Sequence, residues 1–258
     1  MSTVEAWARE FVLSEDLAIK LTPPPPPKMW EPAPAPCRLT VPGRPRELAL
    51  ASRAPKSPKQ GALRSPERRA ELMHTFLHHE LQAAELMAWA LLAFPETPLA
   101  FRRGLLGVLG DEVRHMGLYQ AYLTALGFTY GSFPVRDWFW ERVPKCPAPA
   151  HFAASMGIGF EGGNLDHTQR FAQRLRAAGD ERGAELEERI GREEIPHVRF
   201  ALSWFRHFAG GDGFELWTTY LVSPLTPTVM RGAPINRKSR LESGMSEPFI
   251  DDLAAWSG

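Results

Sequence analysis

Apolar residues recur every three or four positions along four long stretches of the chain, which is the period of an amphipathic α-helix. Met73, Leu77 and Leu91 belong to this series in the first stretch. Capping residues, prolines and glycines mark the ends of the stretches, as they do in helices. The pattern predicts helices at 65–94, 97–126, 150–178 and 180–209.

Shorter amphipathic patterns flank the four long ones and predict one N-terminal helix and two C-terminal helices. Before the first long helix the chain has five consecutive prolines from Pro23, and then Pro32, Pro34 and Pro36. Such a segment cannot form a helix and favours the extended polyproline II conformation, so we interpret it as a semi-rigid strap. The short helices are expected at 2–21, 214–222 and 247–256.

A broken, aromatic segment joins the second and third long helices. Residues 128–147 include Gly131, Pro134 and Trp140, which do not suit a simple exposed turn. About 20 extended residues reach roughly 66 Å, whereas a helix of about 28 residues is roughly 42 Å long. The segment is therefore long enough to cross a helical bundle from end to end.

The predicted fold class is all-α. One long crossover between helices two and three is typical of the ferritin-like four-helix bundle, here with extensions at both ends. Basic residues gather between Arg44 and Arg69, and we interpret this part as a solvated loop. The expected domains are an N-terminal helix and proline-rich strap (1–63), the four-helix bundle (64–210) and a C-terminal helical extension (211–258).

Two Glu-x-x-His pairs lie within the apolar stripes of the predicted helices. Glu112 and His115 form the first pair, and Glu194 and His197 form the second. Residues at this spacing lie on one face of a helix. Each pair has a lone glutamate upstream at nearly the same distance in the sequence. These two glutamates are Glu80 and Glu161.

Four carboxylates and two imidazoles from four helices are the ligand pattern of di-iron and di-manganese bundle proteins. Three protein ligands per metal leave positions for water or dioxygen. Asp111 and Glu193 each precede a ligand glutamate, and we expect them to hydrogen-bond the ligand imidazoles and fix their tautomers. The predicted metal ligands are Glu80, Glu112, His115, Glu161, Glu194 and His197.

Glu85 competes with Glu80 for the role of metal ligand. Glu85 lies five residues after Glu80, so on a helix its side chain is rotated by about 140° from that of Glu80, towards a different face. The sequence around Glu80 also aligns with that around Glu161, with Glu85 opposite Asp166, so the two halves look like a diverged internal repeat. We interpret three further histidines as surface or supporting groups. They are His74, His78 and His79.

Three features leave alternatives open. Pro196 removes a hydrogen bond from the fourth helix and predicts a kink or bulge, for which a functional and a purely structural explanation both stand. Four glycines in 157–163 allow either a substrate or another backbone to approach Glu161 closely. Asn236, Arg237 and Arg240 are candidates for packing over the bundle or for binding an anion.

Charge and cysteine content narrow the possible function classes. The 30 basic and 30 acidic residues balance, so no global field draws in nucleic acid or an acidic membrane. Cys37 and Cys146 are isolated, which fits a reducing compartment and offers no thiolate metal site. No apolar run reaches the roughly 18 residues of a membrane span, and acidic residues occupy the N-terminus where a signal peptide carries bases. We therefore expect a cytoplasmic protein without membrane contact.

The motifs that support a resemblance are 79–86 (HELQAAEL), 111–115 (DEVRH), 194–198 (EIPHV) and the tail 236–252. Through them the chain from about Arg64 onward resembles an uncharacterised bacterial family of ferritin-like proteins. The resemblance implies a di-iron carboxylate four-helix bundle. Pro196 stands where such relatives are expected to have glycine. More distantly, the ligand pattern is similar to that of the di-iron tRNA hydroxylases.

The sequence predicts an oxidoreductase with two iron ions, or manganese, that activates dioxygen and oxidises or hydroxylates an organic substrate. The substrate class stays open between a small molecule and a modified nucleoside. An external partner must supply electrons, because the chain has no flavin, nicotinamide or iron–sulfur motif. The alternatives are an iron-oxidising or iron-storage protein and a peroxide-detoxifying protein. The oligomeric state also stays open, with a homodimer as one option.

Overall fold

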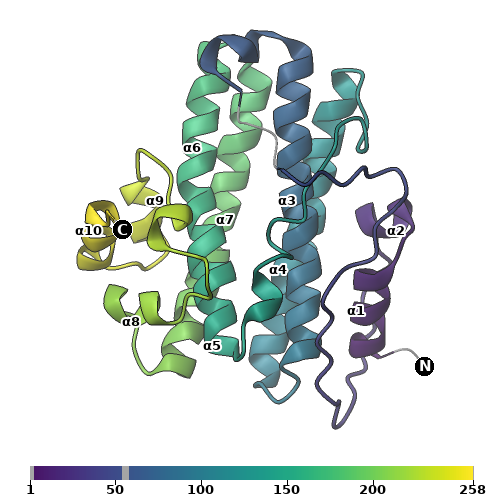
Figure 1. Ribbon diagram of the computed structural model, residues 1–258, viewed down its shortest axis with the longest axis vertical. Coiled ribbons are helices and arrows are strands. Elements are labelled where there is room, and N and C mark those ends of the chain that lie inside the picture. Colours follow the sequence, from purple (N-terminus) through teal and green to yellow (C-terminus); the bar gives the residue numbers. More distant parts are fainter. Residues whose placement is uncertain (1–2, 54–57, 258) are drawn as a thin grey trace. The chain divides into compact units, whose positions relative to one another are not determined.

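Helices form the regular secondary structure of residues 3–53 and 58–257, the ranges that the computed structural model describes (Figure 1). Within these ranges the extended pairing is limited to an isolated bridge between Leu50 and Val135. The all-α fold class is therefore confirmed. The chain divides into two compact units, Met1–Pro144 and Lys145–Gly258. Among the described helices, none is both long enough and apolar enough to span a membrane.

The first unit is built on two long helices that pack along each other, α3 and α4. They confirm the predicted helices at 65–94 and 97–126. The predicted helix at 2–21 is instead two short helices, because the Asp16 side chain accepts a hydrogen bond from the Ala18 N–H and starts a new helix there. The helices of this unit are α1 (Val4–Leu13), α2 (Leu17–Leu21), η1 (Gln60–Arg64), α3 (Pro66–Ala93) and α4 (Leu99–Ala125).

The proline-rich strap is extended, as predicted, and is held by hydrogen bonds to the helices of its own unit. The indole N–H of Trp7 in α1 donates to the Pro24 carbonyl at 2.9 Å. The indole N–H of Trp89 in α3 donates to the Leu39 carbonyl at 2.9 Å. Tryptophan side chains therefore satisfy strap carbonyls that have no helical partner.

The second unit contains the predicted helices at 150–178 and 180–209, but the first of them is not a regular α-helix. Its residues form α5, then a nine-residue π-helical segment, η3, and then α6. Glu161 is the last residue of the π-helical segment. The helices of this unit are α5 (Pro149–Phe152), η3 (Ala153–Glu161), α6 (Gly162–Ala177), α7 (Glu181–Ala209), α8 (Phe214–Thr219), η4 (Pro227–Met230), α9 (Arg237–Glu242) and α10 (Glu247–Ala255).

The π-helical winding of the second unit lies in η3, whereas the helix at Pro196, where we expected a kink or a bulge, has no bulge. Helix α7 continues without a break from Glu181 to Ala209 with Pro196 inside it. Gly157 and Gly159 lie within η3. Glycine weakens the α-helical preference of a segment by about 1 kcal/mol per residue, which favours the wider winding in η3.

The C-terminal extension packs against the glycine-rich face of the preceding helices, which decides between the two explanations for those glycines. A Cβ atom on Gly159 would lie 2.6 Å from the sulfur of Met230, and one on Gly162 would lie 3.2 Å from the Cε of Met245. The glycines at these positions therefore make room for the chain's own C-terminal segment and not for a substrate.

We predict that Gly157→Ala destabilises the protein. A Cβ atom at this position would lie 2.2 Å from the Cβ of Ala201 in α7, and such overpacking costs about 1–3 kcal/mol. Gly107→Ala is the matched control, since nothing lies within 4 Å of its Cβ position on the exposed face of α4. There the better helix propensity should raise stability by roughly 0.5–1 kcal/mol. Urea unfolding measures both; equal effects of the two variants would contradict the close packing of η3 and α7.

Candidate metal centre

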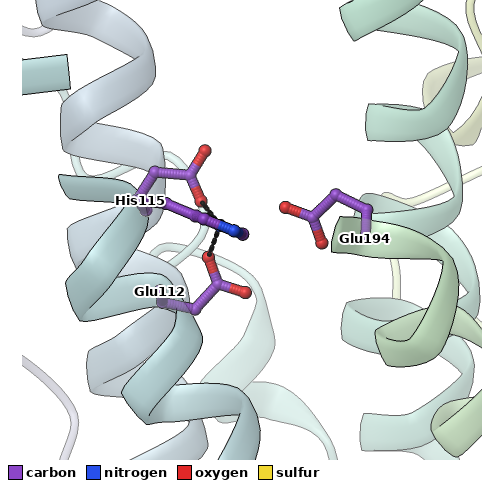
Figure 2. Close-up of side chains that lie close together, drawn as sticks. Glu112, His115 and Glu194 are labelled. Carbon is purple, nitrogen blue, oxygen red and sulfur yellow. Dashed lines mark hydrogen bonds and ion pairs between the residues drawn. The ribbon is translucent and has the colours of Figure 1, made fainter. Parts of the chain in front are cut away.

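In the first unit, α3 and α4 bring together three of the predicted ligands. Glu80 comes from α3, and Glu112 and His115 come from one face of α4. Each offers a ligand atom within 4.8 Å of the others. The Nδ1 atom of His115 lies 3.3 Å from Oε2 of Glu112 and 3.7 Å from Oε2 of Glu80 (Figure 2). All three side chains are buried. We call them the first half-site.

In the second unit, the other three predicted ligands are also brought together. Glu161 comes from the end of η3, and Glu194 (labelled in Figure 2) and His197 come from one face of α7. Their ligand atoms again lie within 4.8 Å of one another. The Nδ1 atom of His197 lies 2.8 Å from Oε2 of Glu194. These buried residues are the second half-site.

Each half-site is a buried cluster of two carboxylates and one imidazole. Such a cluster favours a cation, because buried carboxylates are stable only when they are neutralised or hydrogen-bonded. Carboxylate oxygens and an imidazole Nδ1 form a donor set that suits divalent iron or manganese. The residues of both half-sites therefore fit a metal ion chemically.

Asn164 is a site residue that the sequence reasoning missed. Its side-chain N–H donates to Oε1 of Glu194 at 3.2 Å. Asn164 follows Glu161 by three residues, so the two share one helix face. A polar residue one turn from a predicted ligand was the signal that could have identified it.

Asp111 and Glu193 form ion pairs on their own helices. A carboxylate oxygen of Asp111 lies 2.8 Å from Arg114, and one of Glu193 lies 3.1 Å from Arg189. Their side chains are 45% and 27% exposed. Their expected hydrogen bonds to the ligand imidazoles stay a prediction.

Glu85 lies in a separate buried charge network. Its carboxylate accepts hydrogen bonds from Lys20 (2.6 Å), Arg44 (2.6 and 2.8 Å) and the indole N–H of Trp140 (2.8 Å). Burial raises the pKa of Glu85, but Arg44 and Lys20 outweigh it and hold the pKa below its usual value. Arg44 is thus part of the interior of the unit, contrary to our interpretation of a solvated loop. Glu85 therefore pairs with two buried cations, and Asp137, 2.7 Å from Arg44, supplies the second negative charge.

His78 is also buried, so of the two roles that we gave it, surface or supporting group, the structure leaves the supporting one. Its Nδ1 lies 2.6 Å from the Tyr130 hydroxyl, and its Nε2 lies 3.1 Å from Oδ1 of Asp137. Despite burial, the hydrogen bonds from His78 and Arg44 lower the pKa of Asp137 to about 2. His79 is half-buried and stacks on Phe139. His78 and His79 therefore join the crossover segment to α3, as supporting groups.

His74 is the third of the histidines that were not predicted as ligands, and it makes the stability of the first unit depend on pH. Its Nε2 accepts a hydrogen bond from the Gly131 N–H at 2.9 Å, which requires a neutral ring. Burial, with a smaller contribution from His78, lowers the pKa of His74 to about 4. Between pH 6.5 and about 4 the unfolded chain therefore binds a proton that the folded chain does not.

We predict that the contribution of His74 to stability is fully present above pH 6.5 and decreases as the pH falls to about 4, by at most about 3 kcal/mol. His74→Gln keeps an acceptor for the Gly131 N–H and removes the titration, so its unfolding free energy should depend less on pH. Chemical unfolding of both proteins from pH 7.5 to pH 4 measures the difference. Parallel pH profiles would show that His74 does not titrate with folding.

The predicted repeat is reflected in how each unit holds its terminal segment. Asp166, which aligns with Glu85, is buried in α6 and forms a bidentate ion pair with Arg240. The Arg240 guanidinium donates to Oδ1 of Asp166 at 3.0 Å and to Oδ2 at 2.8 Å. It also accepts backbone N–H bonds from Gly232 and Asn236. Arg240 and Asn236 therefore pack within the unit. Arg237 instead pairs with Asp251 and Glu247 at the surface.

The family model described as "Protein of unknown function (DUF455)" matches residues 3–251, which is nearly the whole chain. No curated protein and no solved structure matches the chain. The comparisons therefore establish a family and leave the chemistry to be argued from the residues.

Proposed function

Because the chain belongs to the DUF455 family, whose function is unknown, we propose its function from its own half-sites. Each half-site holds one iron ion, and the six ligands match the donor set of di-iron carboxylate proteins with a ferritin-like four-helix bundle. The protein is an oxidoreductase that activates dioxygen to oxidise or hydroxylate an organic substrate. The observation that carries the proposal is the repeated donor set, two carboxylates and one imidazole, buried in each unit.

The residues of the chain would hold the metals and keep water away from them. Glu80, Glu112 and His115 would hold one ion, and the second half-site would hold the other. When bound, two iron ions supply electrons to dioxygen, which no side chain can do alone. The ligand helices bury their apolar faces around these residues, with Leu77 and Ile190 fully buried. Such an environment restricts the access of bulk water.

Tyr119, one turn beyond His115 in α4, has no assigned part in this chemistry. It is buried, and its ring centre lies 6.0 Å from that of Phe76. It serves the packing of the two helices.

Electrons for each turnover come from an external donor.

We prefer the oxygenase proposal to iron storage because, in both units, a buried ion pair fixes a terminal segment against the long helices. We call these two parts, the N-terminal strap and the C-terminal extension, the covering segments. Arg44 in the N-terminal strap and Arg240 in the C-terminal extension each pair with a buried acid. Fixed covering segments suit an enclosed site with a defined substrate better than a site through which iron passes in bulk.

The test is metal analysis of the purified protein, followed by anaerobic reduction and exposure to dioxygen with optical detection. We expect two iron ions per chain and an absorption change that depends on dioxygen. Glu80→Ala should lose iron, whereas Glu71→Ala should keep it, since Glu71 pairs with Arg68 at the surface of the same helix.

Two results would redirect the proposal. Iron uptake far beyond two ions per chain, in a large shell, would favour the storage alternative. A protein that binds no iron or manganese after anaerobic reconstitution would exclude the di-metal centre altogether.

A further inference from the structure

The two half-sites differ at one position of the repeat. In the second half-site the Asn164 side chain donates to Oε1 of Glu194 at 3.2 Å. When Glu80 is aligned with Glu161, the residue opposite Asn164 is Ala83. A methyl group cannot donate a hydrogen bond. The amide is therefore a feature of the second half-site alone at this place in the repeat.

The packing of α6 against α7 explains why Asn164 reaches Glu194. Gly191 lies one turn before Glu194, and a Cβ atom on it would be 2.4 Å from the hydroxyl oxygen of Thr168. The Thr168 hydroxyl in turn donates to the Asn164 carbonyl at 2.8 Å. The close approach at Gly191 thus brings α6 near enough for a short amide side chain to contact a ligand on α7.

The Asn164 amide gives the two carboxylate oxygens of Glu194 different partners. Oε1 accepts the N–H of Asn164, and Oε2 faces the Nδ1 of His197 at 2.8 Å. A hydrogen bond to a carboxylate is strong and directional, so it fixes the orientation of the group. An oxygen that already accepts a hydrogen bond is also a poorer donor to a metal. Glu194 is therefore presented as a ligand through Oε2.

A second, independent difference lies in Glu161. This residue ends a π-helical segment, whereas Glu80 lies in the middle of the regular helix α3. A π-helical turn redirects the side chains at its end and is frequent at functional sites. The two half-sites thus share their donor types but differ in the hydrogen bond to Glu194 and in the helix type that presents the lone glutamate.

We propose that Asn164 is a positioning residue that restricts Glu194 to one metal-binding oxygen and makes the second half-site the weaker and more open of the two metal positions. This inference rests on the proposed di-metal function. It assigns the open coordination position, where dioxygen or substrate would bind, to the metal held by Glu161, Glu194 and His197. Loss of one carboxylate oxygen from the donor set weakens the binding of a divalent cation.

The test uses Co²⁺ as the probe, titrated anaerobically into the full-length metal-free protein with calorimetry and visible absorption. Wild type should bind two ions in two steps. The second half-site should have a dissociation constant about tenfold higher than the first, because Oε1 of Glu194 is not available to its metal. Glu80→Ala should remove the tighter step. Asn164→Ala should strengthen the weaker step several-fold, and change its absorption band towards higher coordination, while the tighter step keeps its constant.

Asn236→Ala is the matched control. Its amide donates to the Leu165 carbonyl and to Ser239 in the same unit, and not to a predicted ligand. It should leave both Co²⁺ steps and both absorption bands unchanged. If Asn164→Ala does not fold, Asn164→Ser, which shortens the donor, replaces it.

The outcomes separate this inference from the proposed function. Two equal steps in wild type, or an Asn164→Ala protein with the wild-type constants and bands, would overturn the role of Asn164 and leave the di-metal centre standing. A wild-type protein that binds neither Co²⁺ nor iron would overturn the proposed function itself.

Discussion

Glu112→Gln is expected to reduce strongly the stabilisation of the protein by added metal. A ligand that binds only the folded state stabilises it by about 2.7 kcal/mol for each site when its free concentration is 100 times the dissociation constant. Glu112 belongs to the first half-site and is fully buried in α4. A neutral amide removes one negative donor there with little change of volume, so the first half-site should lose its metal.

The same substitution should have the opposite effect on the metal-free protein. Glu112 lies within 4.8 Å of the carboxylate of Glu80. Two carboxylates held this close without a metal repel each other and disfavour their charged forms. Glu112→Gln should therefore leave the metal-free protein as stable as wild type or more stable, as is common for residues that serve function at the expense of stability.

Thermal unfolding under anaerobic conditions measures both effects, with a chelator or with excess Mn²⁺ or Fe²⁺. Wild type should show a large increase of the unfolding temperature on metal addition, and Glu112→Gln a much smaller one. Glu71→Gln, in its surface pair with Arg68, should respond like wild type. An equal metal response of Glu112→Gln and wild type would remove Glu112 from the list of ligands.

Glu85→Gln is expected to destabilise the first unit strongly. Glu85, Lys20 and Arg44 have side chains that are 0%, 0% and 8% exposed. Removing the carboxylate leaves Lys20 buried without its anion and leaves Arg44 paired with Asp137 alone, and breaking a buried pair in this way costs about 3–5 kcal/mol. The Nζ atom of Lys20 would keep only its bonds to the carbonyls of Phe11 and Val12.

Lys20→Met is the informative comparison for Glu85→Gln. It removes a cation while Glu85 stays paired with Arg44, so its cost should be clearly smaller. Glu141→Gln, at a half-exposed ion pair with Arg136, should change stability by no more than about 0.5 kcal/mol. Urea unfolding gives the three free energies, and hydrogen exchange should show loss of protection in α1 and α2 for Glu85→Gln. A cost below that of Lys20→Met would contradict the role of Glu85 as the anion that pairs with both cations.

The internal repeat links the two kinds of buried acid in this protein. Glu85 lies five positions after Glu80, and Asp166 lies five positions after Glu161. In each unit the first acid lies in a half-site and the second pairs with an arginine from a terminal segment. One helix therefore presents a candidate ligand on one face and an anchor for the covering segment on another.

The sequence alone determined the long helices and the candidate ligands, because both depend on local spacing. The periods of apolar residues predicted α3, α4 and α7 nearly to their ends, and the Glu-x-x-His spacing placed each pair on one helix face. The strap was also predictable, since a run of consecutive prolines removes the backbone N–H groups that a helix needs, whatever surrounds the run.

Only the tertiary structure decided the features that depend on contacts distant in sequence. The helix that continues through Pro196 overrides the local preference of proline, and the π-helical winding before Glu161 combines the weak preference of its glycines with close packing of Gly157 against Ala201. The burial of Arg44 with Glu85 joins residues 41 positions apart, and that of Arg240 with Asp166 joins residues 74 apart. A basic residue in a loop has the same local sequence whether it is solvated or buried, so its partner can be known only from the fold.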